Sequence, residues 1–151
     1  MRERGRVVGV HFFNPAWNMS LLEVHGITGT TSQHTMDTMC NYATSIGKTP
    51  VRGSILNTLM VTHFMQAVRM VERGDARVED VDVAMRQGAG HPHGPFELMD
   101  VIGVDVVRGV VANWHREDRG DPRFFPSAML DGMVERCELG RKTNRGFYCY
   151  S

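Results

Sequence analysis

The chain has 151 residues, of which 42% are hydrophobic, enough for one ordinary domain or for one small domain and part of another. Seventeen basic and seventeen acidic side chains balance, and no basic stripe is interleaved with aromatic residues, so nucleic acid is not an expected partner. No apolar run approaches the roughly 20 residues that span a bilayer, and no export signal precedes the first apolar run, so we expect a cytoplasmic protein with no membrane partner.

The three cysteines, Cys40, Cys137 and Cys149, are odd in number and far apart, and no two form a CxxC pair. This pattern indicates neither a disulfide framework nor a thiolate metal site. A reducing compartment therefore fits the sequence best, and no metal site is predicted.

Three short extended segments and one helix are predicted in the first fifty residues. The extended segments are rich in Val, Leu and Phe or bounded by Gly and Pro: Arg6–Phe13, Ser20–Gly26 and Lys48–Arg52, the last either as a strand or as an extended linker. Thr31 or Ser32 can cap a helix that runs to about Ile46, where Gly47 is placed as a stop.

After Gly53 the pattern becomes helical, because apolar residues recur at helical spacing for about twenty residues until Gly74. Further helices are expected over residues 79–87, from Pro95, over 104–115 and over 126–139, and an extended segment over 146–150.

The first part cannot cover its own strands, since a β-β-α-β piece of about fifty residues has open sheet edges. We therefore expect a mostly α protein in which the last β-β-α-β part of a larger sheet, residues 1–51, precedes a helical domain, residues 52–151.

His11 and Glu23 lie on neighbouring predicted strands joined by a short connection, so their side chains can meet if they point to the same face. In that arrangement the carboxylate fixes the imidazole tautomer and stabilises the imidazolium form of a general base. The alternative is a histidine packed in the core beside Phe12 and Phe13.

Four motifs occur in order: HFFNP with LLEV, GSILNTLM, GHPHGPFELMDVIGVD and GRKTNRGFYCY. Together they resemble the 3-hydroxyacyl-CoA dehydrogenase family, including its 3-hydroxybutyryl-CoA members. The resemblance implies a Rossmann-type NAD domain followed by a helical domain that supplies a homodimer interface and part of the acyl-CoA site. It also implies NAD-dependent oxidation of 3-hydroxyacyl-CoA to 3-ketoacyl-CoA, as in fatty-acid β-oxidation and butanoate metabolism.

The resemblance assigns roles to four residues. His11 falls on the catalytic histidine that takes the proton of the substrate's 3-hydroxyl, and Glu23 falls on the carboxylate that pairs with it. Asn57 falls on the asparagine near the substrate's carbonyl end, and Asn14 is expected to shape the turn beside the site. An ordinary Asn-Pro turn is the alternative for Asn14.

Two of the departures from the family pattern bear most on function. No G-x-G-x-x-G follows a strand, so the cofactor-binding residues are unknown and the chain is expected to lack most of the NAD domain and to be inactive alone. The link from Pro50 to Gly53 is short, which could displace Asn57 from His11 and Glu23. A non-catalytic helical dimerisation or acyl-CoA-binding module is therefore the alternative function.

Other polar residues are given no chemistry. His91 and His93 flank a proline in a turn and have no partner at metal-ligand spacing. His63 is expected to lie in the core or to line the substrate, and Glu97 and Asp100 are expected to cap a helix or pair with basic residues.

Overall fold

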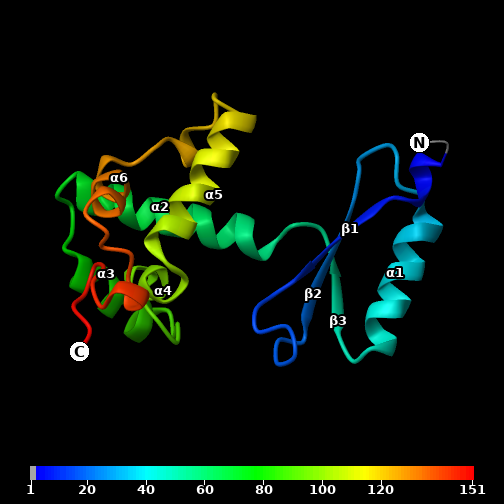
Figure 1. Cartoon of the computed structure of the whole chain (residues 1–151), viewed down its shortest axis with the longest axis horizontal. Coiled ribbons are helices and arrows are strands. Elements are labelled where there is room, and N and C mark those ends of the chain that lie inside the picture. The colour runs from blue at the N-terminus through cyan, green and yellow to red at the C-terminus, as the bar shows by residue number, and fades with distance from the viewer. Residues whose placement is uncertain (1–2) are drawn as a thin grey trace. The chain divides into compact units, whose positions relative to one another are not determined.

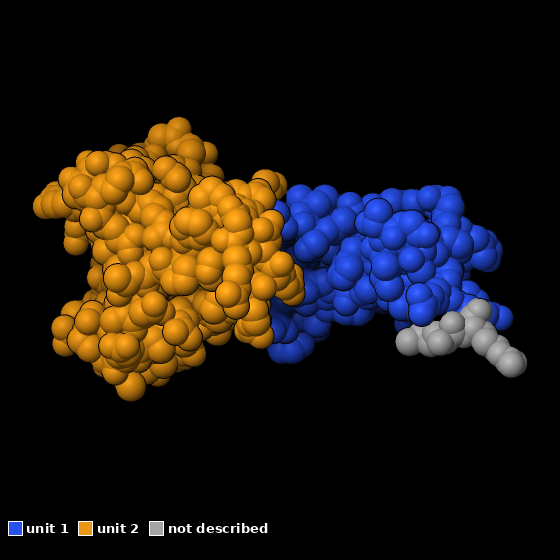
Figure 2. Space-filling view, turned by 90° about the horizontal axis from the view of Figure 1, so that it is seen from above, with its two compact units in different colours: residues 1–58 blue, residues 59–151 orange. Residues whose placement is uncertain are grey.

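The computed structural model describes residues 3–151. The chain divides into two compact units, one ending at Thr58 and the other beginning at Leu59 (Figure 2). Each unit has its own hydrophobic cluster.

The first unit is a small three-stranded sheet with one helix. Its strands have the order β1-β2-β3, with β1 antiparallel to β2 and β2 parallel to β3. The helix α1 lies along one face of this sheet (Figure 1). The elements are η1 (Arg4–Arg6), β1 (Val8–Phe12), β2 (Leu21–Gly26), α1 (Gln33–Ser45) and β3 (Thr49–Arg52).

Helix α1 begins and ends as its sequence predicts. The side chain of Ser32 accepts the N–H of Thr35, and Gly47 has φ +77°, a left-handed conformation that suits glycine. The segment left open as a strand or a linker is the strand β3, because its backbone pairs with β2 over four residues.

The second unit is helical. Its elements are most of α2 (Leu56–Glu72, which begins in the first unit), α3 (Val78–Val83), the π turn η2 (Ala84–Gly88), α4 (Pro95–Ile102), α5 (Val104–Glu117), the short η3 (Pro122–Phe124), α6 (Ala128–Glu135) and the short η4 (Arg141–Thr143). Its core includes the large, fully buried side chains of Phe64, Met65, Phe96, Met99 and Leu130. The expected fold, mostly α after a β-β-α-β part, is confirmed.

Two predicted helices differ at their ends. The segment expected as a helix over 79–87 finishes in the π turn η2, and α6 stops at Glu135 although a helix to 139 is expected. Cys137 has φ 56°, a left-handed backbone conformation that an α-helix cannot contain, so the chain turns there before Leu139.

Two buried carboxylates hold the second unit together. Asp82 accepts the N–H groups of Phe96 and Glu97, both at 2.9 Å, and thereby caps α4. Asp100 accepts the N–H groups of Phe147 and Tyr148, both at 3.0 Å, and so fixes the C-terminal segment. Because both carboxylates are almost fully buried, each hydrogen bond replaces hydration that folding removes.

Within residues 3–151 no helix combines the length and the apolar character needed to cross a membrane.

Candidate active site

The register of the antiparallel strands places His11 directly opposite Glu23. Residues directly opposite each other in such a pair point to the same face, with Cβ atoms about 4.5–5.5 Å apart. The two side chains that the sequence proposes as a catalytic pair therefore share one face of the sheet, both within the first unit.

That face is the one turned away from α1. Side chains alternate along a strand, and the neighbouring pairs Val10 with Val24 and Phe12 with Leu22 point the other way. Val10, Val24 and Leu22 pack in the cluster that includes Ala43 of α1. The polar pair thus lies on the sheet face that α1 leaves open.

Glu23 is held by the beginning of α2. Its side chain is 1% exposed, and its Oε1 atom accepts the N–H groups of Ile55 and Leu56, each at 2.7 Å. The first N–H groups of a helix have no partner within the helix, and the helix dipole favours negative charge at this end. The start of α2 therefore supplies two donors to this buried side chain, while no donor within residues 3–151 is recorded for its second oxygen.

His11 is half-buried, and its ring lies 4.4 Å from the ring of Phe13, at an interplanar angle of 54°. No hydrogen bond to either ring nitrogen is recorded among the described residues, so the imidazole is not yet bonded to Glu23. Such contacts in catalytic pairs are often long without substrate and shorten in the substrate complex. Both ring nitrogens therefore remain available, one for Glu23 and the other for a substrate hydroxyl.

Asn57 follows Leu56 in the first turn of α2, so the hydrogen bonds to Glu23 also fix the position of Asn57 relative to the pair. The short link runs beside β2, because the N–H of Gly53 bonds to the carbonyl of Val24 before the helix begins. Asn57 is half-buried and belongs to the same unit as His11 and Glu23.

Asn14 is exposed and precedes Pro15 through a cis peptide bond in the turn after β1. Sequence reasoning missed what holds this turn. Lys48 donates from Nζ to the carbonyl of Ala16 at 2.5 Å and to that of Met19 at 2.8 Å. Lys48 therefore ties the loop beside His11 to the segment that leads into β3.

A second imidazole on the same face was also missed. His25 pairs with Gly9 across the strands, two residues from Glu23 on the same face, and a Cβ at Gly9 would overlap the His25 ring. Because side chains alternate along a strand, the sequence of β2 alone would have placed His25 on the same face as Glu23. That the His25 ring lies over Gly9 could be found only from the register of the two strands.

His63, His91, His93 and His115 belong to the helical unit. The rings of His63 and His91 have centroids 5.7 Å apart, and burial, together with neighbouring His91, lowers the pKa of His63 below its ordinary value. His93 Nδ1 lies 3.5 Å from Glu97 Oε2. No group of three or more His, Cys, Asp or Glu side chains in residues 3–151 is arranged to hold a metal ion.

The start of α1 does not have the turn expected of a dinucleotide site. The turn that precedes α1 contains one glycine with a positive φ, Gly29, and the side chain of Ser32 caps the helix by accepting the N–H of Thr35. The Thr35 hydroxyl bonds the start of α1 to the carbonyl of Gly5. The start of α1 therefore lacks the glycine-rich turn that cradles a pyrophosphate.

Two family models match the chain. Residues 53–150 match the C-terminal domain of 3-hydroxyacyl-CoA dehydrogenase, and residues 1–55 match the NAD binding domain of the same family. The two matches together run from residue 1 to residue 150.

Curated relatives give the same result. The chain is 43% identical over 150 residues to hydroxyacyl-coenzyme A dehydrogenase, mitochondrial, from Sus scrofa. The aligned region covers 96% of this chain and 48% of that protein. It is 39% identical to 3-hydroxybutyryl-CoA dehydrogenase from Mycobacterium tuberculosis, over 96% of this chain and 52% of that protein. The chain thus spans about half the length of the curated relatives it matches.

A solved structure has the same fold. The structure of 3-hydroxybutyryl-CoA dehydrogenase from Escherichia coli superposes with a TM-score of 0.89 at 37% identity, over 97% of this chain and 32% of that one.

Proposed function

The chain belongs to the 3-hydroxyacyl-CoA dehydrogenase family, and we propose that it supplies the proton-transfer and acyl-CoA-binding residues for oxidation of 3-hydroxyacyl-CoA to 3-ketoacyl-CoA. The observation that carries the proposal is the register pair of His11 and Glu23 on one face of the sheet, with Glu23 anchored by α2.

His11 is the proton acceptor in this proposal. An imidazole titrates near neutrality, so it can take a proton from a bound alcohol and release it again under ordinary conditions. Glu23, held by two backbone N–H groups at the start of α2, receives the other ring N–H and stabilises the imidazolium. Each group therefore has one task, and the imidazole has only to close on the carboxylate to perform it.

Asn57 is the proposed contact for the thioester end of the substrate. Its amide can donate a hydrogen bond to a carbonyl oxygen, and its place directly after Leu56 keeps that donor near the pair. Asn14 shapes the turn beside His11, and Lys48 holds that turn.

The reaction of the family also needs NAD, and residues 3–151 do not fit this cofactor, since they lack a pyrophosphate cradle. The cofactor half of the site must come from other residues, on this polypeptide or on a second one. The contribution of this chain is the acid-base half.

We also infer a homodimer formed through the helical unit. Apart from Val83, four large apolar side chains of that unit are more than 40% exposed: Leu59, Val101, Val106 and Phe125. Large apolar side chains left exposed on helices are available for such an association surface. Sedimentation tests this point. A chain that remains monomeric at about 100 μM would contradict the homodimer.

Calorimetry on the chain tests the proposed function. Acetoacetyl-CoA is expected to bind, and to bind several-fold more weakly to the His11→Gln variant, whereas NADH is expected not to bind to the chain alone. Equal affinity of the wild type and the His11→Gln variant for acetoacetyl-CoA would favour a module that binds acyl-CoA without catalysis. Binding of NADH would contradict the claim that the cofactor half lies elsewhere.

A further inference from the structure

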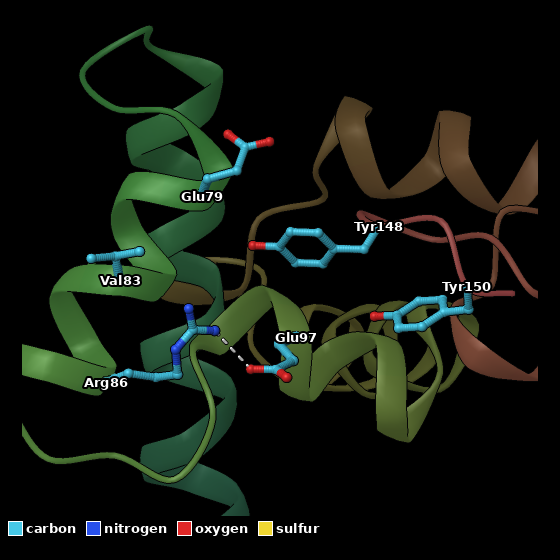
Figure 3. Close-up of a pocket in the computed structure, with 6 residues that line it drawn as sticks. All are labelled: Glu79, Val83, Arg86, Glu97, Tyr148 and Tyr150. Atoms are coloured by element: carbon cyan, nitrogen blue, oxygen red, sulfur yellow. Dashed lines mark hydrogen bonds and ion pairs between the residues drawn. The ribbon is translucent and has the colours of Figure 1, made fainter.

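The helical unit contains a cavity of about 360 Å³ that the proposed reaction does not use. One wall is a single face of α3 and η2, since its residues are spaced four and three apart, and the opposite wall is formed by alternate residues of the C-terminal segment (Figure 3). The lining residues are Glu79, Val83, Arg86, Glu97, Tyr148 and Tyr150.

The two tyrosines bring only acceptor oxygens to this cavity. The hydroxyl of Tyr148 donates to Asp82 Oδ2, and that of Tyr150 donates to Asp100 Oδ2, both at 2.8 Å. A phenol has a single O–H donor, so both donors are used on the buried carboxylates. Arg141 also forms a hydrogen bond with the Tyr150 hydroxyl, so what remains for a ligand is chiefly the oxygen lone pairs and the ring face of Tyr148.

The charged side chains at the cavity are paired, except for one carboxylate. Arg86 donates from Nη1 to Glu97 Oε2 at 2.9 Å, and Arg141 Nη2 lies 3.8 Å from Glu97 Oε1, so both cations are paired with the same carboxylate. Glu79 has no recorded hydrogen bond or ion pair within residues 3–151, and its carboxylate lies on the Tyr148 side of the cavity in Figure 3. Glu79 is therefore the lining carboxylate that remains for the positive charge of a ligand.

The electrostatics of the tyrosines agree with this. Burial, and after it the hydrogen bond to the Asp100 carboxylate, raises the pKa of Tyr150 to about 12. Burial and Asp82 raise the pKa of Tyr148 still further. Neighbouring negative charge is part of both shifts.

One cation already uses an aromatic face here. The guanidinium carbon of Arg141 lies 5.4 Å from the centroid of the Tyr150 ring, within the range of a cation–π contact. The Tyr148 ring has no such partner recorded in the described residues, and the half-exposed Val83 provides apolar surface opposite it.

We propose that this cavity is a binding site for a small organic cation, a primary ammonium or guanidinium group with a short apolar body. The ligand's N–H donors match the Glu79 carboxylate and the phenol oxygens, its charge lies over the Tyr148 ring, and its body contacts Val83. An anionic ligand is disfavoured, because Glu97 occupies Arg86 and Glu79 would repel it.

Matched four-carbon probes test the site on the full chain. Titration with n-butylammonium and with n-butylguanidinium is expected to shift the amide NMR signals of Glu79, Tyr148 and Tyr150 saturably, with a dissociation constant on the order of 1 mM. Butyrate and n-butanol, which share the chain but lack the positive charge, are expected to leave these signals in place.

Two variants of equal charge locate the binding. Glu79→Gln is expected to weaken binding of n-butylammonium about 3- to 10-fold, whereas Glu135→Gln, an exposed glutamate on α6, is expected to leave it unchanged. Equal affinity of the Glu79→Gln variant, equal binding of butyrate, or no saturable shift with either cation would overturn the proposal. The Glu79 side chain is exposed, so its replacement is not expected to disturb folding, and the same spectra report whether it has.

Discussion

The carboxylate of Glu23 and the backbone N–H of Leu56 are joined by a 2.7 Å hydrogen bond, although 33 residues of sequence separate them. This bond connects the middle of β2 to the first turn of α2, and Asn57 is the next residue along the helix. The Glu23 side chain, which is the proposed partner of His11, thus also fixes the start of the helix that carries the proposed substrate amide.

Replacing Glu23 therefore tests a structural role separately from chemistry. Glu23→Ala is expected to lower the free energy of unfolding by about 2–3 kcal/mol, because two helix N–H groups lose their acceptor in a buried place. Glu23→Gln keeps an acceptor oxygen and is expected to cost about half as much. Urea unfolding of the full chain measures both, and an alanine variant within about 0.5 kcal/mol of the wild type would contradict the capping role.

A pair of glycines tests the packing around Asp100. A Cβ at Gly146 would collide with the Asp100 carboxylate and lie 2.6 Å from the Cα of Gly140, so Gly146→Ala is expected to destabilise the chain by at least about 2 kcal/mol. Gly109, inside α5, has nothing within 4 Å of a Cβ, so Gly109→Ala is expected to stabilise the chain by about 0.5–1 kcal/mol. Thermal unfolding of the two variants should move in opposite directions; shifts of the same sign would refute this description.

The stability of the helical unit is expected to depend on His63 through pH. Burial and neighbouring His91 lower the pKa of folded His63 below its ordinary value of 6.5, so the unfolded state binds the proton more readily than the folded state. The contribution of His63 is thus complete above about pH 6.5 and is lost as the pH falls below that value. Between pH 7.5 and 5.5 the free energy of unfolding should fall less steeply for His63→Gln than for the wild type. An equal fall in the two proteins would rule the effect out.

Local features of the fold could be read from the sequence, while long-range contacts could not. The cap at Ser32, the stop at Gly47 and the helix α2 follow from residue types within a few positions, and the short connection between β1 and β2 was enough to place His11 near Glu23. Whether residues 49–52 form a strand or a linker could not be decided from the sequence. A parallel strand is defined by hydrogen bonds to a distant strand, here β2, which the local residue pattern does not indicate.

The partners of the buried carboxylates were out of reach for the same reason. Asp100 was expected to cap a helix or pair with a basic residue, and instead it binds backbone N–H groups 47 and 48 residues away and the hydroxyl of Tyr150. Lys48 likewise bonds to carbonyls 29 and 32 residues earlier. Only folding brings these groups together, so no local pattern predicts them.

The proposed substrate amide can be tested by binding alone. Asn57→Ala is expected to weaken the binding of acetoacetyl-CoA to the chain about 10-fold, the effect of one lost hydrogen bond to a polar ligand group. Asn41→Ala, an exposed asparagine on α1 in the same unit, serves as the control and is expected to have no effect. Equal losses in both variants, or none in either, would remove Asn57 from the site.

Turnover tests the role of His11 most directly. The chain would be joined to the first half of a family member's NAD domain, and formation of NADH from 3-hydroxybutyryl-CoA would be followed for the wild type and for His11→Gln. A proton acceptor typically contributes a factor of about 10² to 10⁴ to the rate. We therefore predict that kcat falls by that factor in His11→Gln, with the free energy of unfolding unchanged. A His11→Gln variant that turns over at the wild-type rate would contradict the assignment of His11 as the proton acceptor.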